Sequence, residues 1–182
     1  MTASEHLPAD YPYAGRFVGP PSSRAHHLPV RVYFEDTDHS GLVYHANYLR
    51  YFERARSDML RLAGIDQKAA FENGKGVYAV ADLHIRYRRP AYYDDALIVV
   101  SCITAIRAAS VIIQQTVIRP DKNGLHHQNA AMERLDEEVL TQATVHAAFL
   151  SRDGKPIRQP KDWIDRFTPL LVPHPDHIAG ED

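Results

Sequence analysis

Residues 47–64 read Asn-Tyr-Leu-Arg-Tyr-Phe-Glu-Arg-Ala-Arg-Ser-Asp-Met-Leu-Arg-Leu-Ala-Gly, and this stretch decides the fold. Its apolar residues recur at spacings of three and four, as in a helix with one side turned towards a core. Asn47 is a candidate N-cap, with a start one or two residues earlier as the alternative. Gly64 is typical of a helix end, because glycine readily adopts the left-handed conformation. The apolar stripe of this long helix consists of Tyr48, Leu49, Phe52, Ala55, Met59, Leu60 and Ala63.

Segments on both sides of the helix favour strands, because they are rich in β-branched residues or alternate in polarity. No helical pattern separates the later strands, so an antiparallel sheet packed on the one long helix fits better than a parallel, doubly wound sheet. The sequence therefore predicts an α+β fold. Residues 125–138 are ambiguous between a short helix and a hairpin extension. The predicted strands cover residues 30–34, 77–88, 96–106, 110–118 and 140–150.

The two ends of the chain differ in composition from the part between them. Residues 1–28 contain four prolines and no apolar periodicity, and we expect them to form a disordered or loosely docked arm. The tail, residues 168–182, is also rich in proline. The predicted domain therefore covers residues 29–167.

Charge and composition exclude several classes of function. Lys and Arg number 21 against 23 Asp and Glu, so nothing indicates a nucleic-acid partner. There is no apolar run of about 20 residues to span a membrane, and no secretory signal pattern. The lone Cys102 is consistent with a reducing compartment, and we expect the protein in the cytoplasm. The His26-His27 and His126-His127 pairs lack partners at zinc-ligand spacing, so no metal site is expected.

The residues that carry chemistry lie immediately before the helix, in the stretch 30–48. A strand leads into a short loop containing Asp38 and Gly41, and the loop leads into the helix N-terminus. The first amides of a helix lack internal partners and carry partial positive charge, so they can stabilise a developing oxyanion. A carboxylate beside them can attack a carbonyl or activate water. Residue by residue, however, an aspartate here is more often a turn former or cap, and His45 a capping histidine.

A family resemblance strengthens the chemical interpretation. The segments Tyr-Phe-Glu-Asp-Thr-Asp at 33–38, Val-Tyr-His-Ala-Asn-Tyr at 43–48 and Phe-Glu-Arg-Ala-Arg at 52–56 closely resemble the YbgC-type acyl-CoA thioesterases. That group is often associated with the Tol-Pal system and is related to the 4-hydroxybenzoyl-CoA thioesterases. The resemblance extends over about residues 29–167. It implies a hotdog fold, with a five- or six-stranded antiparallel sheet curled around the long helix.

The resemblance also implies roles for individual residues. Asp38 matches the catalytic aspartate, as nucleophile or general base, whereas Asp36 does not match that position. The backbone N–H of His45 matches the donor to the thioester carbonyl, and its side chain matches a histidine that positions water or substrate. Tyr44 and Asn47 are expected to contact the substrate. Glu53 is either a site residue or the ion-pair partner of an arginine such as Arg56.

A basic cluster near residue 88 is a candidate binding site for the CoA moiety of the substrate. Arg88 and Arg89 are expected to hold the phosphates of CoA, with a solvated strand end as the alternative. Hydrolysis of an activated thioester requires no metal or redox cofactor, so none is expected.

Three functions follow from these observations. The first is hydrolysis of acyl-CoA, the second is hydrolysis of acyl carrier protein thioesters, and the third is non-catalytic binding of acyl-CoA. The resemblance also implies a homodimer or homotetramer, because such domains build their sites across a subunit interface. Neither the length of the acyl chain nor a preference for aromatic acyl groups is fixed by the sequence.

Overall fold

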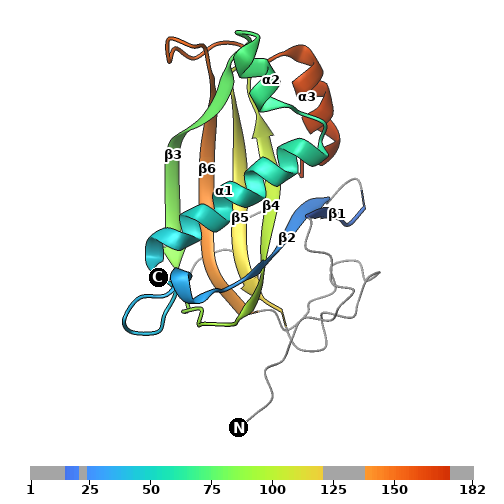
Figure 1. Cartoon of the computed structure of the whole chain (residues 1–182). Coiled ribbons are helices and arrows are strands. Elements are labelled where there is room, and N and C mark those ends of the chain that lie inside the picture. Colours follow the sequence, from blue (N-terminus) through green and yellow to red (C-terminus); the bar gives the residue numbers. More distant parts are fainter. Residues whose placement is uncertain (1–14, 21–23, 121–137, 173–182) are drawn as a thin grey trace, which may run out of the picture.

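The computed structural model describes residues 15–20, 24–120 and 138–172 (Figure 1). Within them, six strands form one antiparallel sheet in the order β1-β2-β4-β5-β6-β3. The strands are β1 (Arg16–Val18), β2 (Ala25–Arg31), β3 (Val77–Tyr87), β4 (Ala96–Ile106), β5 (Ser110–Arg119) and β6 (Glu138–Leu150). None of the described helices has the length and apolar composition needed to span a bilayer.

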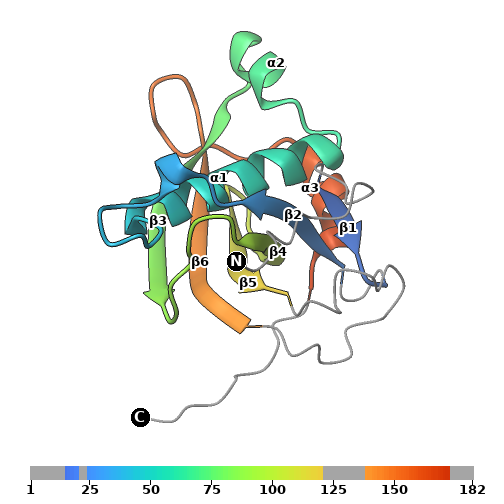
Figure 2. The ribbon, with the colours of Figure 1, turned by 60° about the horizontal axis from the view of Figure 1, so that its bottom comes forward.

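The long helix α1 (His45–Leu62) lies across one face of the sheet, as Figures 1 and 2 both show. It begins two residues before Asn47, which is the earlier of the predicted starts. It ends at Leu62, and Gly64, with a φ of 75°, follows the C-cap residue Ala63. The predicted stripe is wrong at one position. Leu49 is 39% exposed, whereas Tyr51 is fully buried, because the buried side follows the spacing 48, 51, 52, 55 and 59.

The central strands β4, β5 and β6 alternate buried and half-buried residues, with the buried ones facing α1. This alternation is the period-two pattern of a sheet with one face on the core. Two further helices, α2 (Gln67–Glu72) and α3 (Lys161–Phe167), lie at one end of the sheet. There, Trp163 and Phe167 pack with Tyr78 and Phe149 in an aromatic cluster. The predicted strands after the helix agree with β3 to β6 within two residues.

The N-terminal boundary of the domain is earlier than residue 29. Strand β1 and the first half of β2 lie in the segment predicted to be an arm, and both pair within the sheet. His26 is fully buried, its Nε2 lies 2.9 Å from Oδ2 of Asp58 on α1, and the Phe17 ring packs edge-on against it. The segment was mispredicted because His26, His27 and Pro29 do not form an apolar pattern. Burial of His26 depends on a contact with Asp58, which lies 32 residues further along the chain.

The C-terminal boundary is later than residue 167. A 3-10 turn, η4 (Thr168–Leu170), buries Leu170 against the core, and the N–H of Val172 donates to the carbonyl of Ile103 at 2.9 Å. The ambiguous segment 125–138 lies outside the described residues except for Glu138, which opens β6. His126 and His127 also lie outside them.

Candidate active site

The loop between residues 37 and 44 is closed by backbone hydrogen bonds at several points. The N–H of Asp38 donates to the carbonyl of Leu42 at 2.9 Å, and the N–H of Gly41 donates back to the carbonyl of Asp38 at 3.0 Å. Gly41 has a φ of 78°, a conformation that favours glycine. The N–H of Val43 donates to the carbonyl of Ala91 and ties the loop to the segment before β4. The loop therefore presents its side chains from a fixed backbone.

Asp38 is exposed at the tip of this loop. Its Oδ1 accepts hydrogen bonds from the Ser40 hydroxyl and from the Ser40 backbone N–H, the latter at 2.8 Å. These two bonds, with the nearby His39 and His45, hold the pKa of Asp38 below its ordinary value. The side chain is therefore an ionised carboxylate at neutral pH, which is the form required of a nucleophile or a general base.

Asp36 occupies a different environment, although it lies only two residues away. It is buried, and its Oδ2 accepts from the N–H of Tyr33 at 2.9 Å. Its backbone carbonyl accepts from the Tyr44 N–H at 2.9 Å and from Asn47 Nδ2 at 2.8 Å. Asp36 thus holds the loop together through both its side chain and its backbone carbonyl.

Asn47 was predicted to cap the helix and to contact the substrate, and the structure overturns the first of these predictions. It is not the N-cap, because α1 begins at His45 and the capping residue is Tyr44. Asn47 is also buried, and its amide is used within the protein by the carbonyl of Asp36. Its side chain fixes the loop to the helix, and its contact with substrate stays a prediction.

The N-terminus of α1 has free hydrogen-bond donors. Tyr44 makes no side-chain capping bond, and no described residue accepts a hydrogen bond from the N–H of His45 or of Ala46. The His45 ring is exposed and packs against the rings of Tyr44 and Tyr87. The Tyr87 hydroxyl donates to the carbonyl of His45 at 3.1 Å, which joins the end of β3 to the start of the helix.

Exposed aromatic side chains surround this region, and sequence reasoning did not single them out as a group. Phe34 and Tyr93 contact each other edge to face, while Tyr87 also contacts Tyr48. Exposed aromatics of this number on one side of a small domain mark a surface that is covered by a ligand or another chain. The group consists of Tyr33, Phe34, Tyr44, Tyr87, Tyr92 and Tyr93.

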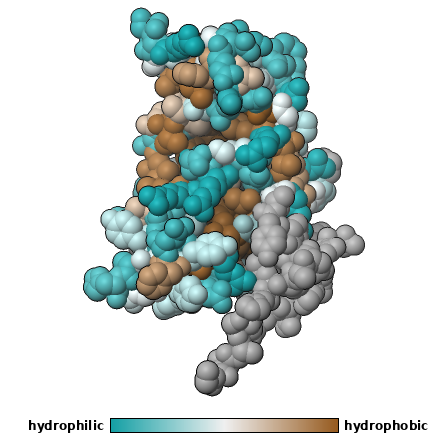
Figure 3. Space-filling view, viewed as in Figure 1, coloured by the Kyte–Doolittle hydropathy of each residue, from teal (hydrophilic) through white to brown (hydrophobic). Residues whose placement is uncertain are grey.

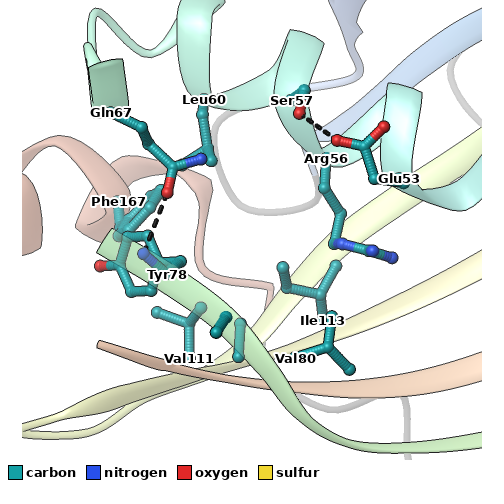
Figure 4. A pocket seen from close by; sticks show the side chains of 12 residues that line it. Glu53, Arg56, Ser57, Leu60, Gln67, Tyr78, Val80, Val111, Ile113 and Phe167 are labelled. Atoms are coloured by element: carbon teal, nitrogen blue, oxygen red, sulfur yellow. Dashed lines mark hydrogen bonds between the residues drawn. The ribbon is translucent and has the colours of Figure 1, made fainter. Parts of the chain in front are cut away.

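A pocket of about 140 Å³ opens on the other half of α1, between the helix and β3 (Figure 4). Figure 3 shows the molecule from the side of the sheet that α1 covers. A hydrophilic band follows the outer side of α1, and hydrophobic residues are visible on either side of this band. No sequence pattern predicted this pocket, because its walls come from six elements, α1, α2, α3, β3, β5 and β6, that are far apart in the chain. The apolar walls include Leu60, Val80, Val111, Ile113, Ala147 and Phe167.

Polar side chains also line the pocket, namely Glu53, Arg56, Ser57 and Gln67. Glu53 Oε1 accepts from the Ser57 hydroxyl at 2.6 Å, and Gln67 Oε1 accepts from the Tyr78 N–H at 3.0 Å. Arg56 donates to Oε1 of Gln115 at 2.7 Å. The Glu53–Arg56 ion pair considered as an alternative does not occur among the described contacts, because each partner bonds elsewhere.

Arg88 and Arg89 lie at the far end of β3, away from the pocket. Arg88 Nε donates to Gln142 Oε1 at 2.7 Å and lines a shallow groove with His84 and Arg86 on the sheet face opposite α1. Arg89 forms an ion pair with Glu138 at 3.0 Å. Neither arginine has a described contact with the Asp38 loop. The described residues contain no group of three His, Cys, Asp or Glu placed to hold a metal ion.

Comparison with known proteins decides the family. The model of the thioesterase-like superfamily matches residues 32–168, which is most of the chain. The chain belongs to the thioesterase-like superfamily. The YbgC acyl-CoA thioesterase of Haemophilus influenzae is 36% identical over 136 residues, covering 74% of this chain and 88% of the relative. The YbgC acyl-CoA thioesterase of Helicobacter pylori (strain ATCC 700392 / 26695) is 33% identical over 135 residues, covering 74% and 93%.

Solved structures agree with this assignment. A probable thioesterase from Bartonella henselae superposes with a TM-score of 0.63 at 32% identity, covering 75% of this chain and 99% of the other. A mutant 4-hydroxybenzoyl-CoA thioesterase complexed with 4-hydroxybenzoyl-CoA has a TM-score of 0.67 at 23% identity, covering 79% and 99%, and shows the shared fold. The predicted α+β hotdog fold and the predicted resemblance to YbgC-type thioesterases are confirmed. The thioesterase prediction is confirmed at the level of the family.

Proposed function

We propose that this thioesterase hydrolyses acyl-CoA to a free acid and CoA, with Asp38 as its catalytic carboxylate. The observation that supports the proposal is the position of an exposed, ionised Asp38 on a fixed loop that leads into the uncapped N-terminus of α1. The named YbgC relatives are acyl-CoA thioesterases, which supports the same substrate class. We place the protein in the cytoplasm, where its single half-buried Cys102 stays reduced.

In the proposed mechanism, the thioester carbonyl oxygen accepts hydrogen bonds from the free N–H groups of His45 and Ala46. These donors and the helix dipole stabilise the negative charge that develops on that oxygen. Asp38 then acts in one of two ways. It attacks the carbonyl carbon and expels CoA thiolate to give an anhydride that water hydrolyses, or it removes a proton from a water that attacks the same carbon.

The proposed site requires a second copy of the chain. The apolar pocket is the candidate for the acyl group, yet Arg56 in the pocket is eleven residues along α1 from His45, or about 16 Å. A short acyl group does not span that distance within one chain. The pocket borders residues 78–80 at one end of β3, and Tyr87 at the other end contacts His45.

The free edge of β3 offers the required pairing. Among the described strands β3 pairs with β6 alone, so its other edge has no strand partner. Near the start of this edge the N–H of Tyr78 donates to Gln67 Oε1, and Val80 is half-exposed. Two copies paired antiparallel about the middle of β3 would place residues 77–80 of one beside residues 84–87 of the other. The Asp38 loop of one copy would then face the pocket of its partner. Burying both edges also removes unpaired backbone groups from solvent.

We therefore expect a homodimer or a homotetramer in solution. Light scattering at micromolar concentration should give a mass of at least twice the chain mass of 20.6 kDa. Val80→Lys should favour the monomer, because it adds a charge at the proposed interface, and its readout is the mass by light scattering, since Val80 also lines the pocket. Lys161→Glu is the control variant, since Lys161 is an exposed side chain of α3 whose described partner is Asp165 on the same helix. A fully active monomer would refute the shared site.

We also propose that Arg88 contacts a phosphate of CoA. Arg88→Ala should raise KM more than it lowers kcat, because a phosphate contact is equally strong in the ground and transition states. The effect should shrink as salt increases, since exposed charges are screened. Arg89→Ala is the comparison and should change KM less, because Glu138 already neutralises Arg89. Unchanged KM for Arg88→Ala at low salt would leave the cluster as a solvated strand end.

A further inference from the structure

The acyl pocket contains a positively charged side chain, Arg56, that forms no ion pair with the one carboxylate in the pocket lining, that of Glu53. Figure 4 shows the Arg56 side chain reaching from α1 towards Ile113, whereas the Glu53 carboxylate is turned towards Ser57. Most of the surrounding wall is aliphatic or aromatic. A guanidinium in such surroundings costs free energy unless it is paired.

Arg56 is poorly paired within the described part of the chain. It is half-buried, and desolvation lowers its pKa from the ordinary arginine value, while the charge of Glu53 acts in the opposite direction without forming an ion pair. A guanidinium has five N–H donors, and Arg56 uses one of them, on the neutral side-chain oxygen of Gln115. No described carboxylate lies within ion-pair distance of it, whereas Arg31, Arg61, Arg89 and Arg119 all have such partners.

A purely structural role does not require the charge. Gln115 is held independently of Arg56, because its Nε2 donates to the carbonyl of Phe52 at 3.0 Å and to the Ser101 hydroxyl at 2.9 Å. An uncharged side chain of similar length would fill the same space at lower desolvation cost. The remaining donors of Arg56 are therefore available to a group that enters the pocket.

We propose that Arg56 selects acyl-CoA substrates whose acyl group ends in a carboxylate. This inference rests on the proposed function and names its substrate class. The planar guanidinium presents parallel N–H groups that match a carboxylate. The pocket volume of about 140 Å³ is close to that of an engineered cavity that holds benzene, so it suits an acyl group of about five or six carbon atoms. The carboxylate would lie against Arg56 and the methylene groups against Val80, Val111 and Ile113.

Glutaryl-CoA and pentanoyl-CoA form a matched pair for the test, because both acyl groups have five carbons and differ in the terminal carboxylate. The wild type should hydrolyse glutaryl-CoA with a kcat/KM about tenfold or more above that for pentanoyl-CoA. Arg56→Met keeps the length of the side chain and removes the charge. It should lower kcat/KM for glutaryl-CoA by about 100-fold, within the range for loss of a charged hydrogen-bond pair, and change that for pentanoyl-CoA by less than about threefold.

Two further variants separate selection from stability. Arg56→Lys keeps the charge without the planar fork and should retain part of the preference for glutaryl-CoA. Arg54→Met is the matched control, because Arg54 is on the same helix but lines the groove on the β2 side, and its preference should equal that of the wild type. Circular dichroism and melting temperature confirm that each variant is folded.

The outcomes distinguish this inference from the function on which it rests. Equal losses on both substrates in folded Arg56→Met would show that Arg56 is structural and would overturn the inference, as would a wild-type preference for pentanoyl-CoA. Either result leaves acyl-CoA hydrolysis standing. Failure of the wild type to hydrolyse either substrate, or any acyl-CoA of a wider panel, would instead refute the proposed function.

Discussion

Replacing Asp38 with alanine or asparagine is expected to lower kcat by about two to four orders of magnitude, the range for removal of a positioned acid–base group. Both variants should remain folded, because Asp38 is exposed and its only described side-chain bonds are to Ser40, two residues away. They should also still bind CoA, since the proposed phosphate contact is elsewhere. Steady-state kinetics on short, long, aromatic and carboxylate-terminated acyl-CoAs would measure the loss on good substrates.

Asp36→Asn is the matched control for this experiment. The asparagine retains an oxygen that can accept from the Tyr33 N–H, so the loop should keep its shape and most of its activity. The side chain is buried, so any cost should be seen in the melting temperature rather than in kcat. Wild-type activity in folded Asp38→Ala would show that another group does the chemistry.

Acidification from pH 7 to pH 5 is expected to destabilise the folded protein by about 2 kcal/mol through His27 alone. Burial, with smaller effects from the nearby Arg16 and His26, lowers the pKa of His27 from 6.5 to about 4. The unfolded chain therefore takes up a proton in this range that the folded chain does not, and each pH unit between the two pKa values costs about 1.4 kcal/mol. Stability is fully present above pH 6.5 and is lost as the pH falls.

Urea denaturation at a series of pH values would measure this slope. His27→Gln cannot titrate and should have a smaller loss between pH 7 and pH 5 than the wild type. The pKa of the neighbouring His26 is also lowered, chiefly by burial, so part of the slope should remain in this variant. Identical slopes for the wild type and His27→Gln would mean that His27 is accessible to protons in the folded protein.

The elements that the sequence predicted well are those whose signal is local. The period of 3.6 residues between Tyr48 and Met59 and the β-branched runs of β4, β5 and β6 are properties of short segments. Such segments bury one side wherever they are placed, so the pattern identifies them without knowledge of their partners. The catalytic roles of Asp38 and His45 stay a prediction, which rests on one continuous motif and on the family resemblance that it carries.

The predictions that failed concern residues whose role depends on a distant partner. Strand β2 was predicted to begin five residues late, since burial of His26 requires Asp58 on α1. Asn47 looked like the cap of α1, but the N-cap is Tyr44, and the side chain of Asn47 donates to the carbonyl of Asp36. Neither contact has a signature in the spacing of the residues involved.

The sequence by itself thus determined the family, the long helix with its antiparallel sheet, and the motif that carries Asp38. Tertiary structure decided where the domain begins, which of the two aspartates is exposed, and that Arg56 enters a pocket with most of its donors unused. It also decided that β3 lies at one edge of the described sheet. The physical reason is that periodicity depends on neighbours in the chain, whereas burial, pairing and cavities depend on segments that meet only after folding.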